Sequence, residues 1–300
     1  MKAVRLKSYG DIDEFVVDEI PMPSPQAGEI LIKIEASAVN HVDLLIRQGY
    51  VAQFIPLELP AVLGTDAAGT VVETGIGVTG IEVGDRVIAD FAHNGKGAHA
   101  EYGVVAIAAV AKLPVGLTFE QGATLPKAGL AGRQSVNALH LKAGDRVLIS
   151  GALGAVGRAA IQYLREIGAN PIAGVRTSRL EEARQLAGEA LDITETPSSA
   201  EFDYAISAAA PVAGNLIRHV RNGGHITSIV PVPEGANADH RVRIDELYHR
   251  TDAEMLQAVV EVASRGELII PIGRTFPLDQ VGAAQSAVAA GVQGKVVLKH

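Results

Sequence analysis

The stretch Val147–Leu164, VLISGALGAVGRAAIQYL, restricts the fold of this chain more than any other segment. An apolar run ends at closely spaced glycines, and a helical pattern of apolar residues follows at once. A strand–turn–helix of this kind needs glycine because the turn is tight, because backbone approaches a pyrophosphate, and because the helix packs closely on the strand. The stretch therefore predicts an α/β fold with a dinucleotide at the helix N-terminus.

The glycine pattern departs from G-x-G-x-x-G at its first glycine, where Ala152 stands. The order of strand, turn, helix and following strand still favours a dinucleotide site, and a glycine-rich turn without a ligand is the alternative. The predicted cofactor-binding residues of this turn are Ala152, Gly154, Ala155, Val156 and Gly157.

The end of the second predicted strand, IAGVRTSRLEE, bears on the choice of dinucleotide. NAD sites carry an Asp or Glu about 20 residues beyond the glycines, which binds the ribose hydroxyls. Here Arg176, Ser178 and Arg179 occupy that region, and the first acidic residue is Glu181. Guanidinium groups suit a 2′-phosphate and a carboxylate repels it, so the segment predicts NADP(H). The alternative is a solvated arginine at a helix start.

The chain changes character near residue 119. Before it, short alternating strands lie between glycine turns, which indicates a small β-barrel or sandwich. After it, apolar strands alternate with helices of about ten or more residues, which indicates a doubly wound parallel sheet covered on both faces. The last segment adds one helix and a final apolar strand.

Composition excludes several classes of protein. The net charge is −8 without basic clustering, so we expect no nucleic-acid partner. The absence of cysteine excludes disulfides, thiolate nucleophiles and cysteine-ligated zinc. The longest apolar run, Val104–Ala111, is far shorter than the ~20 residues of a membrane helix. The N-terminus has no apolar core typical of a signal peptide, so a cytoplasmic protein is expected.

Several segments match one known group in combination. They are AVNHVDLLIRQG, LPAVLGTDAAGTVVETGIGVTGIEVGDRV, GAHAEYGVV, ATLPKAGLAG, ALGAVG and the terminal GKVVL. On these segments, nearly the whole chain resembles the zinc-independent quinone oxidoreductase (zeta-crystallin-like) group of the medium-chain dehydrogenase/reductase superfamily.

The resemblance implies a GroES-like β-rich catalytic domain and a Rossmann cofactor domain. We expect the catalytic domain at residues 1–118 and 262–300, and the NADP-binding domain at residues 119–261, with the active site in the cleft between them. The resemblance also implies that Lys295 of GKVVL contacts the cofactor. It further suggests a homodimer formed edge to edge by the cofactor domains, with His225–Val230 as the candidate strand; the alternative is that its apolar residues belong to the ordinary core of the sheet.

The same resemblance bears on zinc. Zinc-dependent relatives place cysteine where Asn40 stands and histidine where Thr65 stands. An amide and a hydroxyl are poor zinc ligands, so no metal is expected. Without a Lewis acid, reduction of a simple ketone is difficult, whereas a quinone or a conjugated enone spreads the charge that follows hydride transfer.

The predicted catalytic residues are Asn40, Tyr50 and Lys127. Asn40 would orient the acceptor oxygen, although a buried structural amide is an equal alternative. Tyr50 would face the substrate or merely pack. Lys127 would stabilise a developing anion or hold a phosphate, with a solvated loop lysine as the alternative. Asp43 and Arg47, four residues apart on a predicted helix, would form a supporting ion pair.

The predicted function is hydride transfer from NADPH to a quinone. The alternative within enzymes is reduction of the double bond of 2-alkenals or enoyl thioesters. The alternative of another class is an NADPH-binding sensor or structural protein with little turnover.

Arg133 stands near a position where many relatives have tryptophan, which leaves the shape of the substrate pocket open.

Overall fold

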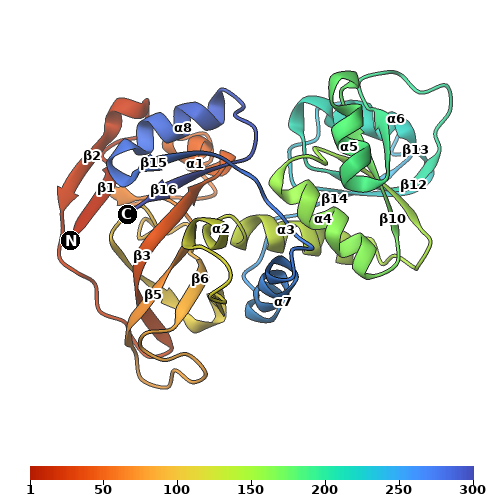
Figure 1. Ribbon diagram of the computed structural model, residues 1–300. Coiled ribbons are helices and arrows are strands. Elements are labelled where there is room, and N and C mark those ends of the chain that lie inside the picture. Colours follow the sequence, from red (N-terminus) through yellow and green to blue (C-terminus); the bar gives the residue numbers. More distant parts are fainter. The chain divides into compact units, whose positions relative to one another are not determined.

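The computed structural model describes residues 1–300, and the chain forms two compact units. The first comprises Met1–Lys127 and Thr251–His300, and the second comprises Ala128–Arg250 (Figure 1). The domain boundaries expected from the sequence, after residues 118 and 261, stay a prediction. None of the helices combines the length and the hydropathy that a membrane-spanning helix needs.

The first unit is built on two β-sheets. The larger has the order β15-β16-β3-β5-β6-β8, with β7 also paired to β3, and the smaller has the order β2-β1-β4. The strands are β1 (Lys2–Leu6), β2 (Phe15–Glu19), β3 (Glu29–Val39), β4 (Ala61–Val62), β5 (Asp66–Thr74), β6 (Arg86–Asp90), β7 (Tyr102–Ala106), β8 (Val110–Lys112), β15 (Ile272–Pro277) and β16 (Lys295–Lys299). The helices of this unit are α1 (His41–Arg47), α2 (Phe119–Ala123), α7 (Ala253–Ser264) and α8 (Val281–Ala289).

Strand β3 organises this unit because it pairs antiparallel with three others: β5, β7 and β16. Its alternating isoleucines, Ile30, Ile32 and Ile34, are fully buried in one core with residues of β5, β6 and β7. The pairing of β3 with β16 joins the two ends of the chain in one sheet, since Val39 lies opposite Val296.

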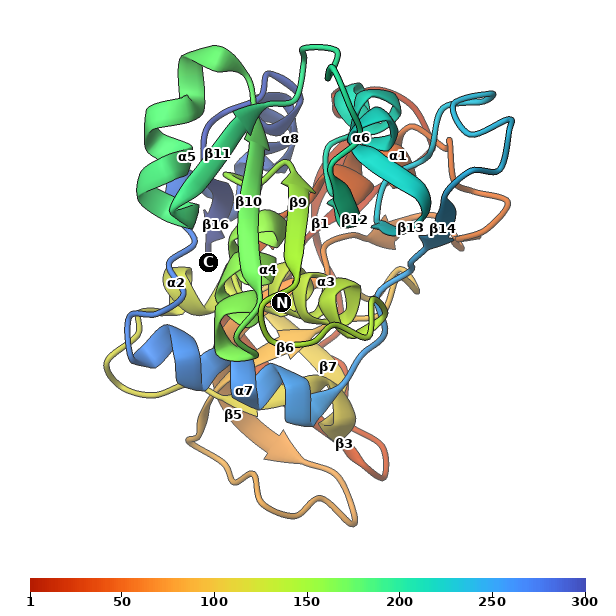
Figure 2. The ribbon, with the colours of Figure 1, turned by 90° about the vertical axis from the view of Figure 1, so that its right-hand side faces the viewer.

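The second unit has one six-stranded sheet in which every pairing is parallel. Its order is β11-β10-β9-β12-β13-β14, visible across Figure 2. In chain order this is 3-2-1-4-5-6, the order of a doubly wound dinucleotide-binding fold. The strands are β9 (Arg146–Ser150), β10 (Asn170–Val175), β11 (Glu189–Asp192), β12 (Phe202–Ser207), β13 (Val220–Ser228) and β14 (Arg243–Glu246).

Helices cover both faces of this sheet, because successive strand residues point to opposite sides. On β9, Val147 and Ile149 pack into a core with residues of α3, α4 and α5, whereas Leu148 packs into a second core with residues of α6. The helices are α3 (Pro126–Asn137), α4 (Ala155–Glu166), α5 (Leu180–Ala187) and α6 (Ala213–His219). The predicted combination of a β-rich part and a doubly wound parallel sheet is confirmed.

The strand expected at a dimer edge is placed differently. His225–Val230 falls largely within β13, which has β12 on one side and β14 on the other. The edges of the sheet are β11 and β14, so the prediction of His225–Val230 as an edge strand is wrong. Strand β14, RVRIDEL in context, is short and polar and gives little periodic signal in the sequence.

Candidate active site and cofactor site

The glycine-rich turn joins β9 to α4 with almost no free space. Gly151 has φ +70°, a conformation that favours glycine. A Cβ on Gly157 would lie 2.4 Å from the carbonyl oxygen of Gly151 and 2.6 Å from Cα of Ala152. Gly154 precedes the helix, and its N–H donates to the Gly151 carbonyl at 2.9 Å. The turn thus keeps the helix start and the strand end in close contact.

The start of α4 presents donors to a ligand. Arg158 makes a helical hydrogen bond to the Gly154 carbonyl at 2.9 Å, and the amides of Ala155, Val156 and Gly157 precede it. Amides in the first turn of a helix have no acceptor within the helix. Together with the helix dipole they suit a pyrophosphate, so the residues of the turn fit a dinucleotide.

The loop after β10 holds the three residues predicted to select the dinucleotide. Arg176 and Ser178 are exposed. Arg179 is partly buried and pairs with Glu182, with its Nε 2.7 Å from Oε2 of that carboxylate.

This loop is also hydrogen-bonded to a carboxylate that the local sequence pattern does not predict. Asp192 ends β11, and its Oδ2 accepts hydrogen bonds from the backbone N–H of Thr177, at 2.8 Å, and from the Thr177 hydroxyl. The hydrogen bond from the Thr177 hydroxyl, with further bonds from Thr194, lowers the pKa of Asp192 to about 2. Because β11 lies next to β10 in the sheet, only the strand order could have brought Asp192 to this loop.

In the first unit, Asn40 belongs to a hydrogen-bonded group that we call the Asn40 cluster: Asn40, Thr65, Asp66 and Lys295. Asn40 precedes α1, and its Nδ2 donates to Oδ2 of Asp66 at 3.1 Å and to the Thr65 hydroxyl at 3.5 Å. The Lys295 ammonium donates to Oδ1 of Asn40 at 2.5 Å and to Oδ2 of Asp66 at 3.2 Å. Both ends of the Asn40 amide are therefore fixed.

Asp66 is the centre of this cluster and is completely buried. Its second oxygen, Oδ1, accepts a hydrogen bond from the backbone N–H of Lys127 at 3.0 Å. The first turn of α3 therefore contacts Asp66. A buried carboxylate needs such partners, because an unpaired charge in a protein interior is costly. The predicted cofactor contact Lys295 thus lies beside the predicted catalytic Asn40, and its role toward a cofactor stays a prediction.

Lys127 lies next to the Asn40 cluster and has further partners of its own. Its ammonium is 3.9 Å from Oδ1 of buried Asp90 and 3.4 Å from Nε2 of His93. Asp90 also accepts the Thr251 hydroxyl at 2.8 Å. The side chain of Lys127 is almost entirely buried, so the alternative of a solvated loop lysine is wrong.

Asp43 and Arg47 do not form the predicted ion pair. Oδ2 of Asp43 accepts the backbone N–H of Asn40 at 2.8 Å, which closes the start of α1, and Oδ1 has no hydrogen-bond partner. Burial raises the pKa of Asp43 to about 6. Arg47 turns instead to the side chain of Gln285 on α8, at 2.8 Å, and to the carbonyl of Gly10.

The two remaining side chains discussed for the substrate pocket differ in exposure. Tyr50 is 70% exposed, so a role toward the substrate stays a prediction. Arg133 is buried in the second unit, donates to Glu166 at 2.6 Å and stacks over the ring of Tyr163 at 4.4 Å. Through these two contacts, Arg133 on α3 stabilises the packing of α3 against α4.

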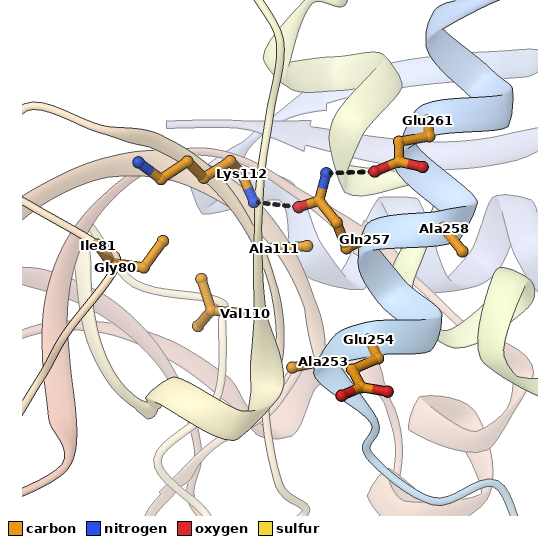
Figure 3. A pocket seen from close by; sticks show the side chains of 10 residues that line it. All are labelled: Gly80, Ile81, Val110, Ala111, Lys112, Ala253, Glu254, Gln257, Ala258 and Glu261. Carbon is orange, nitrogen blue, oxygen red and sulfur yellow. Dashed lines mark hydrogen bonds between the residues drawn. The ribbon is translucent and has the colours of Figure 1, made fainter.

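A separate open groove of about 490 Å³ lies in the first unit, between β8 and α7 (Figure 3). Several of its lining residues are apolar, and two hydrogen bonds join its polar ones: the N–H of Lys112 donates to Gln257 at 3.2 Å, and Nε2 of Gln257 donates to Glu261 at 3.4 Å. None of the candidate site residues lines it; the lining residues are Gly80, Ile81, Val110, Ala111, Lys112, Ala253, Glu254, Gln257, Ala258 and Glu261. No group of three or more His, Asp or Glu residues is arranged to hold a metal ion.

Known proteins resemble this chain along its whole length. Residues 26–115 match the alcohol dehydrogenase GroES-like domain, and residues 168–298 match the zinc-binding dehydrogenase family. A chloroplastic quinone-oxidoreductase homolog of Spinacia oleracea is 30% identical over 249 residues, which are 78% of this chain and 76% of the relative. A chloroplast envelope quinone oxidoreductase homolog of Arabidopsis thaliana is 28% identical over 317 residues, 98% of this chain and 95% of the relative.

Solved structures agree with these relatives. The quinone oxidoreductase of Coxiella burnetii has a TM-score of 0.89 at 28% identity, covering 100% of this chain and 99% of that one. An alcohol dehydrogenase superfamily protein of Novosphingobium aromaticivorans has a TM-score of 0.89 at 27% identity, with the same coverage. The family implies an oxidoreductase that acts on a small molecule with a nicotinamide cofactor. The chain belongs to the quinone oxidoreductase group of the medium-chain dehydrogenase/reductase superfamily.

Proposed function

We propose that this oxidoreductase transfers a hydride from NADPH to a quinone and that no metal ion takes part. The observation that carries the proposal is the Asn40 cluster, in which an amide and a hydroxyl stand where zinc-dependent relatives have ligands. Asn40 and Thr65 offer neutral oxygen and nitrogen atoms that bind zinc poorly. When bound, NADPH supplies the hydride.

The Asn40 amide is suited to orient an acceptor oxygen. The Lys295 ammonium donates to its carbonyl oxygen, which polarises the amide and strengthens its N–H groups as donors. One of those N–H groups has only the long 3.5 Å contact to Thr65, so it is available to an acceptor oxygen while the other N–H keeps its bond to Asp66. A single amide stabilises an oxyanion less than zinc does, which favours a quinone, whose ring spreads the charge.

NADPH is proposed because cationic and hydroxyl side chains follow β10. Arg176 and Ser178 are exposed and Arg179 is close behind them, whereas the nearest following acids in the sequence are Glu181 and Glu182. Tyr50 and Lys127 are proposed as further substrate contacts and Lys295 as a cofactor contact. A homodimer and a cytoplasmic location complete the proposal.

Cofactor oxidation followed at 340 nm tests the reaction. We would treat the purified protein with a chelator and mix it with NADPH or NADH and with small quinones, 2-alkenals or a simple ketone. Fast oxidation of NADPH with quinones alone is the expected result. Preference for alkenals would move the activity to double-bond reduction, and tight NADPH binding without turnover would favour a sensor or structural role. Activity that disappears with chelation would contradict metal independence.

Replacement of Asn40 tests the proposed role of its amide. We expect Asn40→Ala to lower kcat for quinone reduction about 10- to 100-fold, because an oriented donor is lost, with a smaller effect on the Kd of NADPH. Gln48→Ala, at the exposed other end of α1, is the matched control and should keep full activity. An Asn40→Ala enzyme with unchanged kcat would contradict the role.

A further inference from the structure

Three charged side chains of the second unit form a cluster that the glycine pattern does not include. Glu182 on α5 is 2.5 Å from the guanidinium of Arg179 and 3.5 Å from that of Arg158 on α4. One carboxylate therefore lies between two arginines, and an excess of one positive charge remains. We call Arg158, Glu182 and Arg179 the arginine–glutamate cluster.

The arginine–glutamate cluster connects the two segments that flank the adenosine ribose in a doubly wound fold. Nε of Arg158 donates to the carbonyl of Leu153, within the glycine-rich turn, at 3.1 Å. Arg179 lies in the loop that follows β10 and leads into α5. Arg179 of the cluster thus lies just beyond the end of β10, where NAD-specific relatives of the fold have a carboxylate.

The donors near this place are limited. The backbone N–H and the hydroxyl of Thr177 already go to Asp192, which leaves the arginines and Ser178 for a ligand. Burial lowers the pKa of Arg158, the carboxylate of Glu182 raises it, and the charge of Arg179 lowers it further. The two guanidinium groups share the one carboxylate of Glu182. Crowded guanidinium groups gain when a dianion joins them, because a phosphomonoester accepts several charge-assisted hydrogen bonds.

We propose that the arginine–glutamate cluster binds the phosphomonoester of the cofactor's adenosine ribose, and that Glu182 limits the strength of that binding. The proposal rests on NADPH as the cofactor and adds Arg158 and Glu182 to its site. Glu182 neutralises part of the cationic charge and competes with phosphate for the same guanidinium groups. Its removal strengthens binding of NADPH and leaves binding of NADH unchanged.

The Glu182→Gln variant tests the proposal by a gain of affinity, which misfolding cannot produce. We would titrate the intact protein with NADPH and with NADH and follow nucleotide fluorescence. The expected result is a Kd for NADPH about fivefold lower, as for removal of one partly screened charge, with the Kd for NADH within about twofold. Glu181→Gln is the matched control, because the neighbouring carboxylate of Glu181 accepts a hydrogen bond from Gln185 instead of an arginine. An unchanged or higher Kd for NADPH in Glu182→Gln would overturn the role of Glu182.

Arg158→Gln and Arg179→Gln test the phosphate contact itself, with Arg184→Gln, within α5, as the control. In both variants the Kd for NADPH should rise by a factor at least about tenfold larger than the factor for NADH, because a charge-assisted hydrogen bond to the phosphate is lost. Adenosine 2′-monophosphate, as a probe, should bind tighter than the 5′-isomer, and less so below pH 6, where the phosphate gains a proton. If the wild type prefers NADPH and no variant alters the preference, the proposal for the arginine–glutamate cluster fails, whereas NADPH as the cofactor stands. If the wild type binds NADH equally well and Glu182→Gln creates a preference for NADPH, the cofactor proposal fails and the cluster stands.

Discussion

Among single residues, Asp66 and Lys295 form the most enclosed ion pair, with side chains 0% and 8% exposed. We predict that Lys295→Met lowers the free energy of unfolding by about 3 kcal/mol, because a buried carboxylate loses its counter-ion but keeps its other donors. Urea denaturation at neutral pH measures the change. The double variant Asp66→Asn with Lys295→Met should recover most of the loss, since no charge is left unpaired.

An exposed pair provides the control for this prediction. Lys33 is half exposed and lies 2.9 Å from Glu35. Lys33→Met should therefore cost less than about 1 kcal/mol. A loss for Lys295→Met no larger than that for Lys33→Met would show that the Asp66 charge is stabilised by Asn40 and the Lys127 amide alone.

Local residue patterns were sufficient for some of the site and not for the rest. Gly151 and Gly157 were predictable because a tight turn restricts nearby residues in the sequence. The contact between Asp66 and Lys295 joins residues 229 positions apart, so no local sequence pattern predicts it. The predicted pair of Asp43 and Arg47 failed for a related reason: capping of α1 occupies Asp43, and Arg47 finds a partner on α8.

At the level of elements, alternation and helical periodicity were sufficient for the fold class, because each buried strand of the parallel sheet is apolar on both faces. The edge of the sheet was not predictable in the same way. Strand β14 has charged residues at both ends and only intermediate or exposed positions, so its sequence looks like a loop. Its pairing with β13 depends on tertiary structure.

The junction of β9 and α4 gives a prediction about these elements. Gly157→Ala places a Cβ within 2.6 Å of two backbone atoms of the turn, so α4 must move away from β9. We expect a loss of about 1–3 kcal/mol in unfolding free energy, the usual cost of overpacking, and a Kd for the dinucleotide at least about tenfold higher through the displaced helix start. Gly116→Ala, which would meet nothing within 4 Å, is the control. Wild-type affinity in Gly157→Ala would contradict a close turn.

For the whole molecule, buried histidines predict how stability depends on pH. Burial lowers the pKa of His99 to about 3 and that of His300 to about 4. Their pKa in the unfolded chain is about 6.5, so the unfolded state binds more protons and stability falls as the pH drops from about 6.5 to 4. The pKa of Asp43 is raised to about 6, so its protonation opposes this loss below about pH 6. Burial also lowers the pKa of His41 and of His219, which adds to the loss. The shifts of His99 and His300 against that of Asp43 already leave about one proton, so stability should fall by at least about 1.4 kcal/mol per pH unit.

His99 offers the sharpest test of this pH dependence, because it is fully buried and neither ring nitrogen has a hydrogen-bond partner. His99→Leu removes the titrating group without stranding a polar partner, so at pH 7.5 the free energy of unfolding should stay within about 1.5 kcal/mol of wild type. Between pH 6 and 4 its slope should fall by about 1.4 kcal/mol per pH unit relative to wild type. Urea unfolding at several pH values measures both slopes, and His240→Asn, at an exposed position with φ +50°, is the control. If the free energy of unfolding falls equally steeply with pH in His99→Leu and in wild type, water reaches His99. Its burial then does not cause the loss of stability between pH 6 and 4.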